Sequence, residues 1–439
     1  MIAAPPVQPV PLPVAGPAAT SAAVLPVGLA VPPDWAAKTA FDIALLIVET
    51  NPQLLAHRAN GRRAVNQVGE QTVRQLKWAA KLLDKSMGRP FWTRTRDDVV
   101  ELDKWFDRLP TMTGKSPRHR EDSCTLEMIE AEALERIDDG DISADDIGFT
   151  TANTNKHYRF LSQIDKFAAK HIPGLSLVGF PDFCTVDQKD ERDARLRISN
   201  EQATAIFGLP PWAGSASLDD RLAPGDSLYH DGLYWVLLLV WYTGARREEI
   251  CKLMVVDVDC IGGIWFLQIR FSETGRVKNR KSVRIIAVAE ELVRLGFIEF
   301  VHAMKAAGET ILFPELMPSG GTKRKLGDVF YKLWWIYIAP MVEPKLGRGQ
   351  AMHSCRHAVD DELKRNEIFV ETRNDLMGWT GKGGEGETRY PGPTALAKLK
   401  AAVDLIPVVT AHLPGIAASA IRLLPAEARV ARPSRAKAA

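Results

Sequence analysis

Several kinds of residue and segment are scarce or missing in the 439-residue chain, and each absence argues against a class of protein. Its five cysteines are scattered and form no Cys-x-x-Cys pair, so we expect reduced thiols rather than a disulfide framework or a zinc site. Residues 1–33 carry no charge and are interrupted by prolines, which argues against both a signal peptide and a membrane-spanning helix. The longest later apolar run, residues 233–242, is too short to cross a bilayer and predicts a buried helix.

What is present is the composition of an ordinary globular protein. Charged residues make up 25% of the chain and hydrophobic residues 46%, which excludes collagen-like, coiled-coil and largely disordered classes. The length exceeds what one compact core usually holds, so two or three domains are expected. Reduced thiols and the lack of a membrane segment predict a cytoplasmic location.

The order of patterns along the chain predicts five regions. We expect a disordered, Pro- and Ala-rich leader at 1–33, a helical domain at 34–174, a polar linker at 175–198, a second domain at 199–406 and a loose tail at 407–439. The fold class predicted is mainly α with a small β-hairpin or sheet (α+β). No strand pattern is apparent in the first domain, which reads as a helical bundle.

Specific patterns support these assignments. Helical spacing of apolar residues predicts first-domain helices over about 71–87, after a capping box at Thr95 and Asp98, and over about 125–137 and 152–171. In the second domain, a capping box begins at Ser199. Two β-rich runs, at 264–271 and 283–288, flank a basic loop and predict a hairpin with a long connection.

Charge is divided unevenly within the first domain. Residues 58–120 contain fifteen Lys and Arg against seven Asp and Glu, whereas residues 121–146 contain eleven acids and only Arg136. A basic face of this kind suits a polyanion such as the DNA backbone. Taken alone, however, the feature equally describes a solvated surface of alternating charge, which is the more common explanation.

Four pieces of the second domain combine chemically active residue types. The first, Thr243 to Ile250, reads TGARREEI; the second, Lys278 to Arg284, is a basic loop; and the third, His353 to His357, reads HSCRH. The last runs from Leu376-Met377-Gly378-Trp379 through a glycine-rich stretch to Thr388-Arg389-Tyr390. An arginine pair can fork onto phosphate oxygens and stabilise charge that grows on phosphorus during bond breaking.

The order of these pieces resembles the tyrosine recombinase (phage integrase) family. That family has a TGxRxxE box, a hairpin lysine, an HxxRH box, a Gly-His or Gly-Trp pair and a terminal tyrosine. Leu312-Phe313-Pro314 also looks like the family. The resemblance covers about residues 199–406, and with weaker support it matches residues 70–174 to the family's helical core-binding domain. Two departures are Arg247, where an apolar or small residue is usual, and a slightly long gap between Trp379 and Tyr390.

Residue types and resemblance together nominate six catalytic residues. Arg246 and Arg356 would clamp the phosphate, although either alone would pass for a surface ion pair. Tyr390 is the candidate nucleophile because, of seven tyrosines, it alone sits in a glycine-rich polar stretch beside an arginine. The remaining candidates are Lys278, His353 and Trp379.

These three candidates have open alternatives. The resemblance gives Lys278 the role of general acid for the leaving oxygen, with Lys281 as its rival. His353 would help to position groups at the phosphate or would accept a proton there, yet a lone histidine is more often structural. Trp379 can donate its indole N–H to a phosphate oxygen but cannot move a proton, and it could equally pack in the core. Glu249 and His357 are candidates for orienting the arginines and His353.

The resemblance implies a site-specific recombinase or integrase that cleaves and rejoins double-stranded DNA through a 3′-phosphotyrosine, without cofactor, metal or ATP. It implies a homotetramer on synapsed sites, a monomer or dimer before synapsis, and a C-terminal helix that packs in trans. Bacterial cytoplasm, no membrane partner and accessory proteins of a mobile element would fit this picture. Alternatives are a type IB topoisomerase-like enzyme or telomere resolvase, and a DNA-binding relative with a decayed site.

Overall fold

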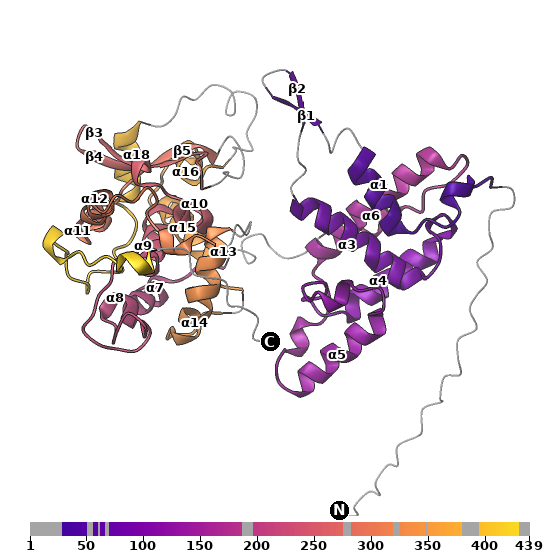
Figure 1. The fold of residues 1–439 in the computed structure, drawn as a ribbon, viewed down its shortest axis with the longest axis horizontal. Helices are drawn as coiled ribbons and strands as arrows, with labels where there is room; N and C mark the ends of the chain where they lie inside the picture. Colours follow the sequence, from indigo (N-terminus) through magenta and orange to yellow (C-terminus); the bar gives the residue numbers. More distant parts are fainter. Residues whose placement is uncertain are drawn as a thin grey trace, which may run out of the picture. The chain divides into compact units, whose positions relative to one another are not determined.

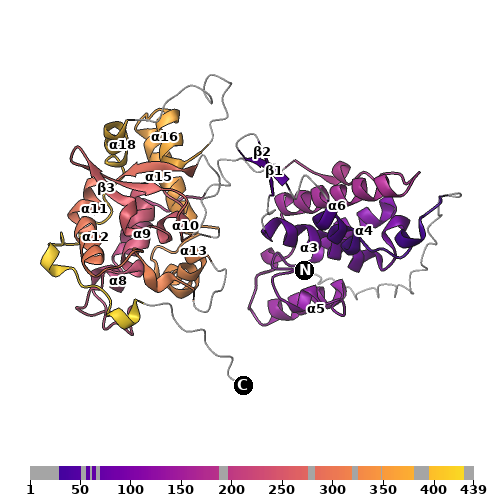
Figure 2. The ribbon, with the colours of Figure 1, turned by 45° about the horizontal axis from the view of Figure 1, so that its top comes forward.

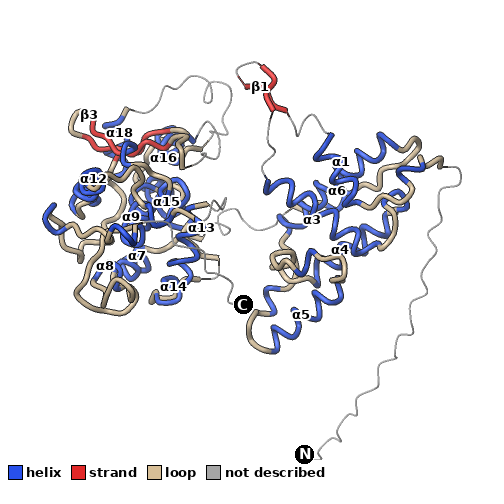
Figure 3. Tube along the Cα trace, viewed as in Figure 1, coloured by secondary structure: helices blue, strands red, loops and turns tan. Residues whose placement is uncertain are grey.

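The computed structural model describes residues 29–50, 56–59, 62–65, 70–186, 196–274, 282–318, 325–347, 349–379 and 395–429. The chain divides into two compact units, Met1–Gln188 and Lys189–Ala439 (Figure 1), and each is described by itself. Helices dominate both, with short strands (Figure 3), which confirms the predicted fold class. Most of the predicted leader, residues 1–28, lies outside the described residues. None of the described helices is long and apolar enough to cross a membrane.

The first unit is built from helices that bury one apolar face each. They are α1 (Ala40–Thr50), α3 (Glu70–Met87), α4 (Arg96–Arg108), α5 (Leu126–Asp138) and α6 (Thr151–His171). The four helices predicted from periodicity are thereby confirmed. At the start of α4, the Thr95 N–H donates to Asp98 Oδ2 at 2.6 Å, as the predicted capping box requires. The shared core includes Leu83, Leu102 and Leu161, all buried.

The first unit also contains a β-hairpin, so the expectation of an uninterrupted helical bundle is wrong. Strands β1 (Ala56–Ala59) and β2 (Arg62–Val65) pair antiparallel, with Arg58 opposite Arg63 and Ala59 opposite Arg62. The pattern was missed because four-residue strands rich in arginine show no apolar alternation. The sequence Asn-Gly between them is nevertheless a strong signal for a two-residue hairpin turn.

Parts of the stretch expected as a linker at 175–198 pack on the two units. Phe180 is buried, and Val178 and Phe183 pack against the first unit's core. The Val178 N–H donates to Asp165 of α6 at 3.1 Å, which fixes this return path. At the other end of the stretch, Ile198 belongs to the second unit's core. These apolar residues are scattered among charges, so composition averaged over the segment concealed them; residues 187–195 lie outside the described ranges.

Helix α9 (Gly232–Thr243) forms the centre of the second unit, and all its residues are buried, as its apolar run predicted (Figure 2). It packs against α10 (Arg247–Cys251), α11 (Glu290–Arg294) and α15 (His353–Arg365). The remaining described helices of the unit are α7 (Asn200–Phe207), α8 (Pro210–Ala213), α12 (Phe297–Ala306), α13 (Leu326–Phe330) continued by a π turn (Tyr331–Trp335), α14 (Ile336–Ile338), α16 (Val370–Met377) and α18 (Leu396–Val403).

A three-stranded antiparallel sheet covers one side of the second unit. Its order is β3 (Val258–Ile261), β4 (Ile264–Ile269) and β5 (Arg284–Ala287), with Ile269 opposite Arg284. The predicted hairpin is confirmed as β4 and β5. Strand β3 was not predicted because it is only four residues long and is followed directly by Gly262-Gly263. The long connection between β4 and β5 contains residues 275–281, outside the described residues.

The segment expected as a loose tail from residue 407 instead packs on the second unit as far as residue 429. Val409, Thr410 and Leu413 are buried. Thr410 Oγ1 lies 2.6 Å from the Tyr242 hydroxyl and donates to Glu291 at 2.5 Å. Arg294 donates to the backbone carbonyls of Thr410 and Leu413. The Ala- and Pro-rich composition suggested disorder, but a few apolar side chains suffice to dock the segment.

Candidate active site and nucleic-acid interface

A glycine turn presents Arg246 at the end of the central helix. Gly244 ends α9 with a left-handed φ of 62°, and a Cβ there would lie 2.7 Å from the Met377 side chain. Arg246 then caps α10: its N–H donates to Glu249 Oε2 at 2.9 Å and its Nη1 to Oε1 at 2.7 Å. About a fifth of the Arg246 side chain is exposed, as expected for a group that faces a ligand.

The Glu249 carboxylate holds a second arginine as well. Arg284, the first residue of β5, donates from Nη2 to Glu249 Oε2 at 2.9 Å, and both side chains are buried. Burial opposes ionisation of Glu249, but Arg284 and Arg246 outweigh it and keep the pKa of this carboxyl below its usual value. Glu249 therefore orients Arg246, as the sequence suggested for it.

Arg356 reaches the same place from α15. Its Nη1 donates to the Gly244 carbonyl at 2.7 Å and its Nη2 to the Met377 carbonyl, and its Nε is buried without a hydrogen-bond partner among the described residues. Burial, together with repulsion from Arg246 and Arg284, lowers the pKa of Arg356 to about 9. Keeping this buried guanidinium charged therefore costs free energy. A bound anion would offset that cost.

Trp379 lies directly after the glycine that ends α16. The Gly378 backbone has a φ of 60°, and the backbone N–H of Trp379 donates to the Asn374 carbonyl at 3.0 Å. The Arg356 guanidinium carbon lies 5.0 Å from the centre of the indole ring, within the range of a cation–π contact. Trp379 also packs against the core, so both readings of this residue are compatible with its position.

The HxxRH box is helical and forms the start of α15. His353 is the first residue of α15 and is exposed, whereas Arg356 is buried one turn later. The rings of His353 and His357 meet edge to face, with centroids 5.0 Å apart. His357 is thus placed to orient His353, the role suggested from its sequence position.

Two of the six nominated residues, Lys278 and Tyr390, lie outside the described residues. The described chain stops at Thr274 and resumes at Ser282, and it stops again at Trp379 and resumes at Ala395. Both gaps open beside the arginine cluster, because Ser282 accepts a hydrogen bond from Arg284 and Trp379 lies beneath Arg356. Lys278 and Tyr390, together with the rival Lys281, stay predictions.

Arg284 is the residue of this cluster that was not singled out from the sequence. It closes the basic run that begins at Lys278, so it could pass for one more exposed cation. The available signal was its place in a strand, directly before Ile285 and Ile286, where an exposed loop cation is not expected.

The unusual Arg247 faces away from this cluster. Its Nη2 donates to Asp328 of α13 at 2.9 Å, and its guanidinium lies 5.0 Å from the Tyr331 ring. The neighbouring Glu248 accepts the Gly327 N–H at 2.7 Å. This departure from the family pattern therefore joins α10 to α13 and does not add a charge to the arginine cluster.

The charge division of the first unit is partly cancelled in space. Acids of the 121–146 stretch pair with cations of the 58–120 stretch: Lys81 with Asp122, Arg108 with Glu130, and Arg118 with Glu132. Arg94 is buried in a pair with Asp165. These pairs favour the more common explanation given from the sequence, a solvated surface on which charges of both signs meet.

A narrower cationic surface remains on α6, which we call the α6 stripe: Lys156, Arg159, Lys166 and Lys170. Their spacing places them on one face of the helix over about 21 Å. None has an ion-pair partner among the described residues, and the one acid of α6, Asp165, is buried on the opposite side.

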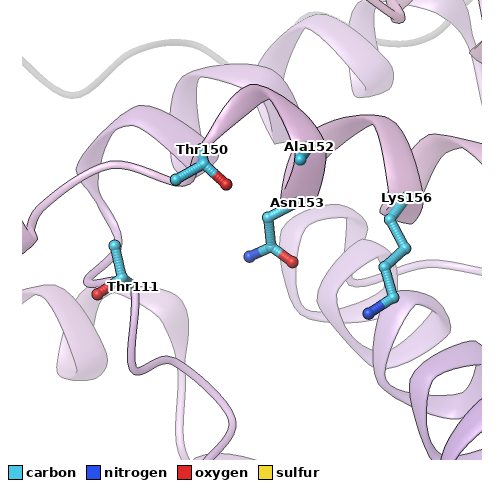
Figure 4. Close-up of a pocket in the computed structure, with 5 residues that line it drawn as sticks. All are labelled: Thr111, Thr150, Ala152, Asn153 and Lys156. Atoms are coloured by element: carbon cyan, nitrogen blue, oxygen red, sulfur yellow. The ribbon is translucent and has the colours of Figure 1, made fainter. Parts of the chain in front are cut away.

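The α6 stripe ends at a hollow of about 410 Å³. Figure 4 shows Asn153 and Lys156 of α6 beside it, with Thr111 across from them. Thr150 and Ala152 complete its lining at the start of the helix. This polar lining with a cation suits a phosphate group of a larger polyanion more than an apolar ligand.

Comparison with known proteins gives similarity to solved structures only. No protein-family model and no curated protein matches the sequence. An integrase of the Tn1549 transposon in complex with transposon right end DNA is 15% identical, with a TM-score of 0.45 over 82% of this chain and 97% of that chain. XerH site-specific recombinase bound to difH is 13% identical, with a TM-score of 0.39 over 78% and 92%. The integrase of mycobacterium phage Brujita is 12% identical, with a TM-score of 0.32 over 77% and 85%.

Proposed function

We propose that the chain is a site-specific DNA recombinase of the tyrosine recombinase class. One observation carries the proposal: Arg246 and Arg284 both pair with the Glu249 carboxylate, and the buried Arg356, from a third distant segment, lies close enough to be repelled by both of these arginines. The buried Arg356 Nε has no partner among the described residues. Such a cluster suits an anion whose charge grows during reaction.

The reaction that fits this cluster is a transesterification at phosphorus. The Tyr390 phenol gives its proton to His353 as its oxygen attacks the scissile phosphate, a bond from phosphorus to the tyrosine oxygen forms, and the bond from phosphorus to the 5′-oxygen breaks. Arg246 and Arg356 stabilise the phosphate oxygens, while Lys278 gives a proton to the leaving 5′-oxygen. The product is a 3′-phosphotyrosine and a free 5′-hydroxyl. A second attack by a 5′-hydroxyl reverses these steps and rejoins the strand.

Duplex DNA is the proposed partner of the first unit as well. The α6 stripe supplies cations that nothing among the described residues neutralises, and the β1–β2 hairpin pairs two arginines with no acid between residues 51 and 69. Further copies of the chain, a tetramer on two synapsed sites, complete the proposal. Helix α18 packs on β5 of its own chain in this structure, so any exchange in trans would have to displace it.

The experiment is covalent capture on nicked duplex substrates taken from the DNA that flanks the gene. Wild type should form a protein–DNA adduct, and Tyr390→Phe should form none while binding the same DNA equally well, because only the attacking oxygen is lost. Tyr337→Phe, which alters an exposed tyrosine on α14, is the matched control and should react like wild type.

Two outcomes would revise the proposal. An undiminished adduct in Tyr390→Phe would remove this residue from the nucleophile's role, and no adduct from wild type would favour a DNA-binding relative. Recombinant products, rather than relaxed plasmid alone, would distinguish a recombinase from a type IB topoisomerase-like enzyme.

A further inference from the structure

All three nitrogens of the Arg284 guanidinium donate hydrogen bonds to other parts of the protein. Its Nε donates to the Leu376 carbonyl at 2.7 Å, its Nη1 to the Ser282 carbonyl at 3.0 Å and its Nη2 to Glu249 at 2.9 Å. Only 6% of the side chain is exposed. With all three nitrogens engaged and almost no exposure, Arg284 is not placed to contact a substrate phosphate itself.

The three acceptors belong to three different pieces of the candidate active site. Glu249 orients Arg246. Leu376 directly precedes Met377, whose carbonyl accepts from Arg356, and the turn to Trp379 follows. Ser282 directly follows the segment that contains Lys278. A single side chain therefore connects segments that lie 35 and 92 residues from it along the chain.

The packing around Arg284 leaves little room for alternatives. A Cβ on Gly378 would lie 3.0 Å from Arg284 Nη1 and 3.2 Å from its Cδ, and the φ of 60° at Gly378 already disfavours any other residue. The glycine of the Gly-Trp pair thus makes space for this guanidinium. The orientation of Arg284 and the turn before Trp379 depend on each other.

Removing Arg284 would change the electrostatics of Glu249 specifically. Glu249 Oε1 would keep its bond to the Arg246 side chain, but Oε2 would keep only the Arg246 N–H. A buried carboxylate with fewer donors is costly, and it would rotate or draw in water. Arg246 would lose its fixed orientation in either case.

We propose that Arg284 is a positioning residue for the phosphate-transfer reaction, acting through Glu249 on Arg246 and through Leu376 on the turn that carries Trp379. This inference rests on the proposed function for its consequence on rate, whereas the structural link it describes does not. A displacement of a catalytic group by about 1 Å can lower a rate by about 100-fold.

The kinetic test compares Arg284→Met with Arg270→Met in the full-length protein. Arg270 directly follows β4, the strand next to β5, and pairs with Asp257 at 2.5 Å. It is a suitable control because, within the described residues, it makes no hydrogen bond or ion pair to the cluster. At saturating DNA, Arg284→Met should form adduct about 100-fold more slowly than wild type, with its DNA affinity kept within about threefold. Arg270→Met should match wild type in both measurements.

A double-mutant cycle tests whether Arg284 acts through Glu249. If it does, the double variant Arg284→Met, Glu249→Gln should form adduct no more than about threefold more slowly than the slower of the two single variants. Multiplied losses would instead show that Arg284 acts independently of Glu249 and would overturn the inference. A general loss of folding would lower DNA binding together with rate, which the affinity measurement detects.

Hydrogen exchange on the free protein gives a readout that needs no activity. In Arg284→Met, amides of residues 245–251 and 376–379 should exchange faster, while Arg270→Met should leave both stretches as in wild type. If wild type forms no adduct but this exchange pattern appears, the proposed function fails and the link through Arg284 stands. Unchanged exchange, or a wild-type adduct rate in Arg284→Met, would overturn the inference.

Discussion

Glu315 carries a carboxyl group that keeps its proton unusually well. Its Oε1 accepts the Gly232 N–H at the start of α9 at 2.6 Å. Loss of surrounding water, together with the nearby Asp231, raises the pKa of Glu315 from 4.5 to about 8. Across neutral pH the folded protein therefore holds a proton here that the unfolded chain releases.

This difference in proton binding makes the second unit less stable as pH rises. Since the folded pKa lies above the unfolded one, the free energy of unfolding contributed by Glu315 is greatest below about 4.5 and falls as pH rises to about 8. Glu315→Gln should come close to wild type at pH 5 and exceed it at pH 9 by on the order of 4 kcal/mol. Urea unfolding at a series of pH values measures this; parallel curves for the two proteins would refute it.

At the scale of single residues, the sequence identified the nominated catalytic residues better than the residues that hold them in position. Arg246 and Arg356 could be nominated because each stands in a short motif, and the structure brings them close enough for Arg246 to lower the pKa of Arg356. Arg284 could not, because its role depends on a carbonyl 92 residues away. Side-chain contacts over such distances follow from how helices and strands pack, which no local pattern encodes.

At the scale of elements, the α6 stripe makes a prediction about salt. Each phosphate contact releases condensed counterions, so the slope of log Kd against log salt concentration falls by about 0.9 per contact removed. The double variant Lys166→Gln, Lys170→Gln should therefore lower this slope by about 2. Measurements of DNA binding from low to moderate salt would show it.

The control for the stripe removes the same charge elsewhere in the first unit. Lys104→Gln with Arg136→Gln changes two exposed cations that already pair with Glu101 and Asp141. We expect the slope of this variant to stay at the wild-type value. Equal slopes for the two double variants would mean that α6 does not lie on the DNA.

Element lengths explain which parts of the fold the sequence predicted. Helices α3 to α6 are long enough to repeat their apolar spacing several times, so periodicity predicted them. Strands β1, β2 and β3 have four residues each, too few for alternation to show. Charge along the chain likewise could not show which acids fold back onto the cations of residues 58–120, three of which pair with acids of residues 121–146.

At the scale of the whole molecule, the segment 407–429 is a structural part of the second unit. Besides the buried Thr410, it places the Arg422 carbonyl 2.8 Å from the His230 N–H and pairs Arg429 with Glu309. Its docking buries several apolar side chains, each of which contributes about 1.5–3 kcal/mol when fully removed from water.

Truncation tests this contribution directly. Deleting residues 408–439 should destabilise the second unit by more than about 4 kcal/mol, because Val409 and Leu413 leave the core and Glu291 loses the donor Thr410. Deleting only 430–439 is the control and should change the free energy of unfolding by less than about 0.5 kcal/mol. Denaturant titration of the two proteins measures both; similar loss in both would contradict the structure.

The packing of residues 407–429 has a consequence for the order of events on the ribosome. Translation makes every motif residue, Tyr390 included, before it reaches Val409. A chain that terminates early between these points has its reactive groups yet cannot complete the wall beside Tyr242. Under the proposed function, a chain released between Tyr390 and Val409 would carry every nominated catalytic residue but would lack the segment that completes the core of the second unit.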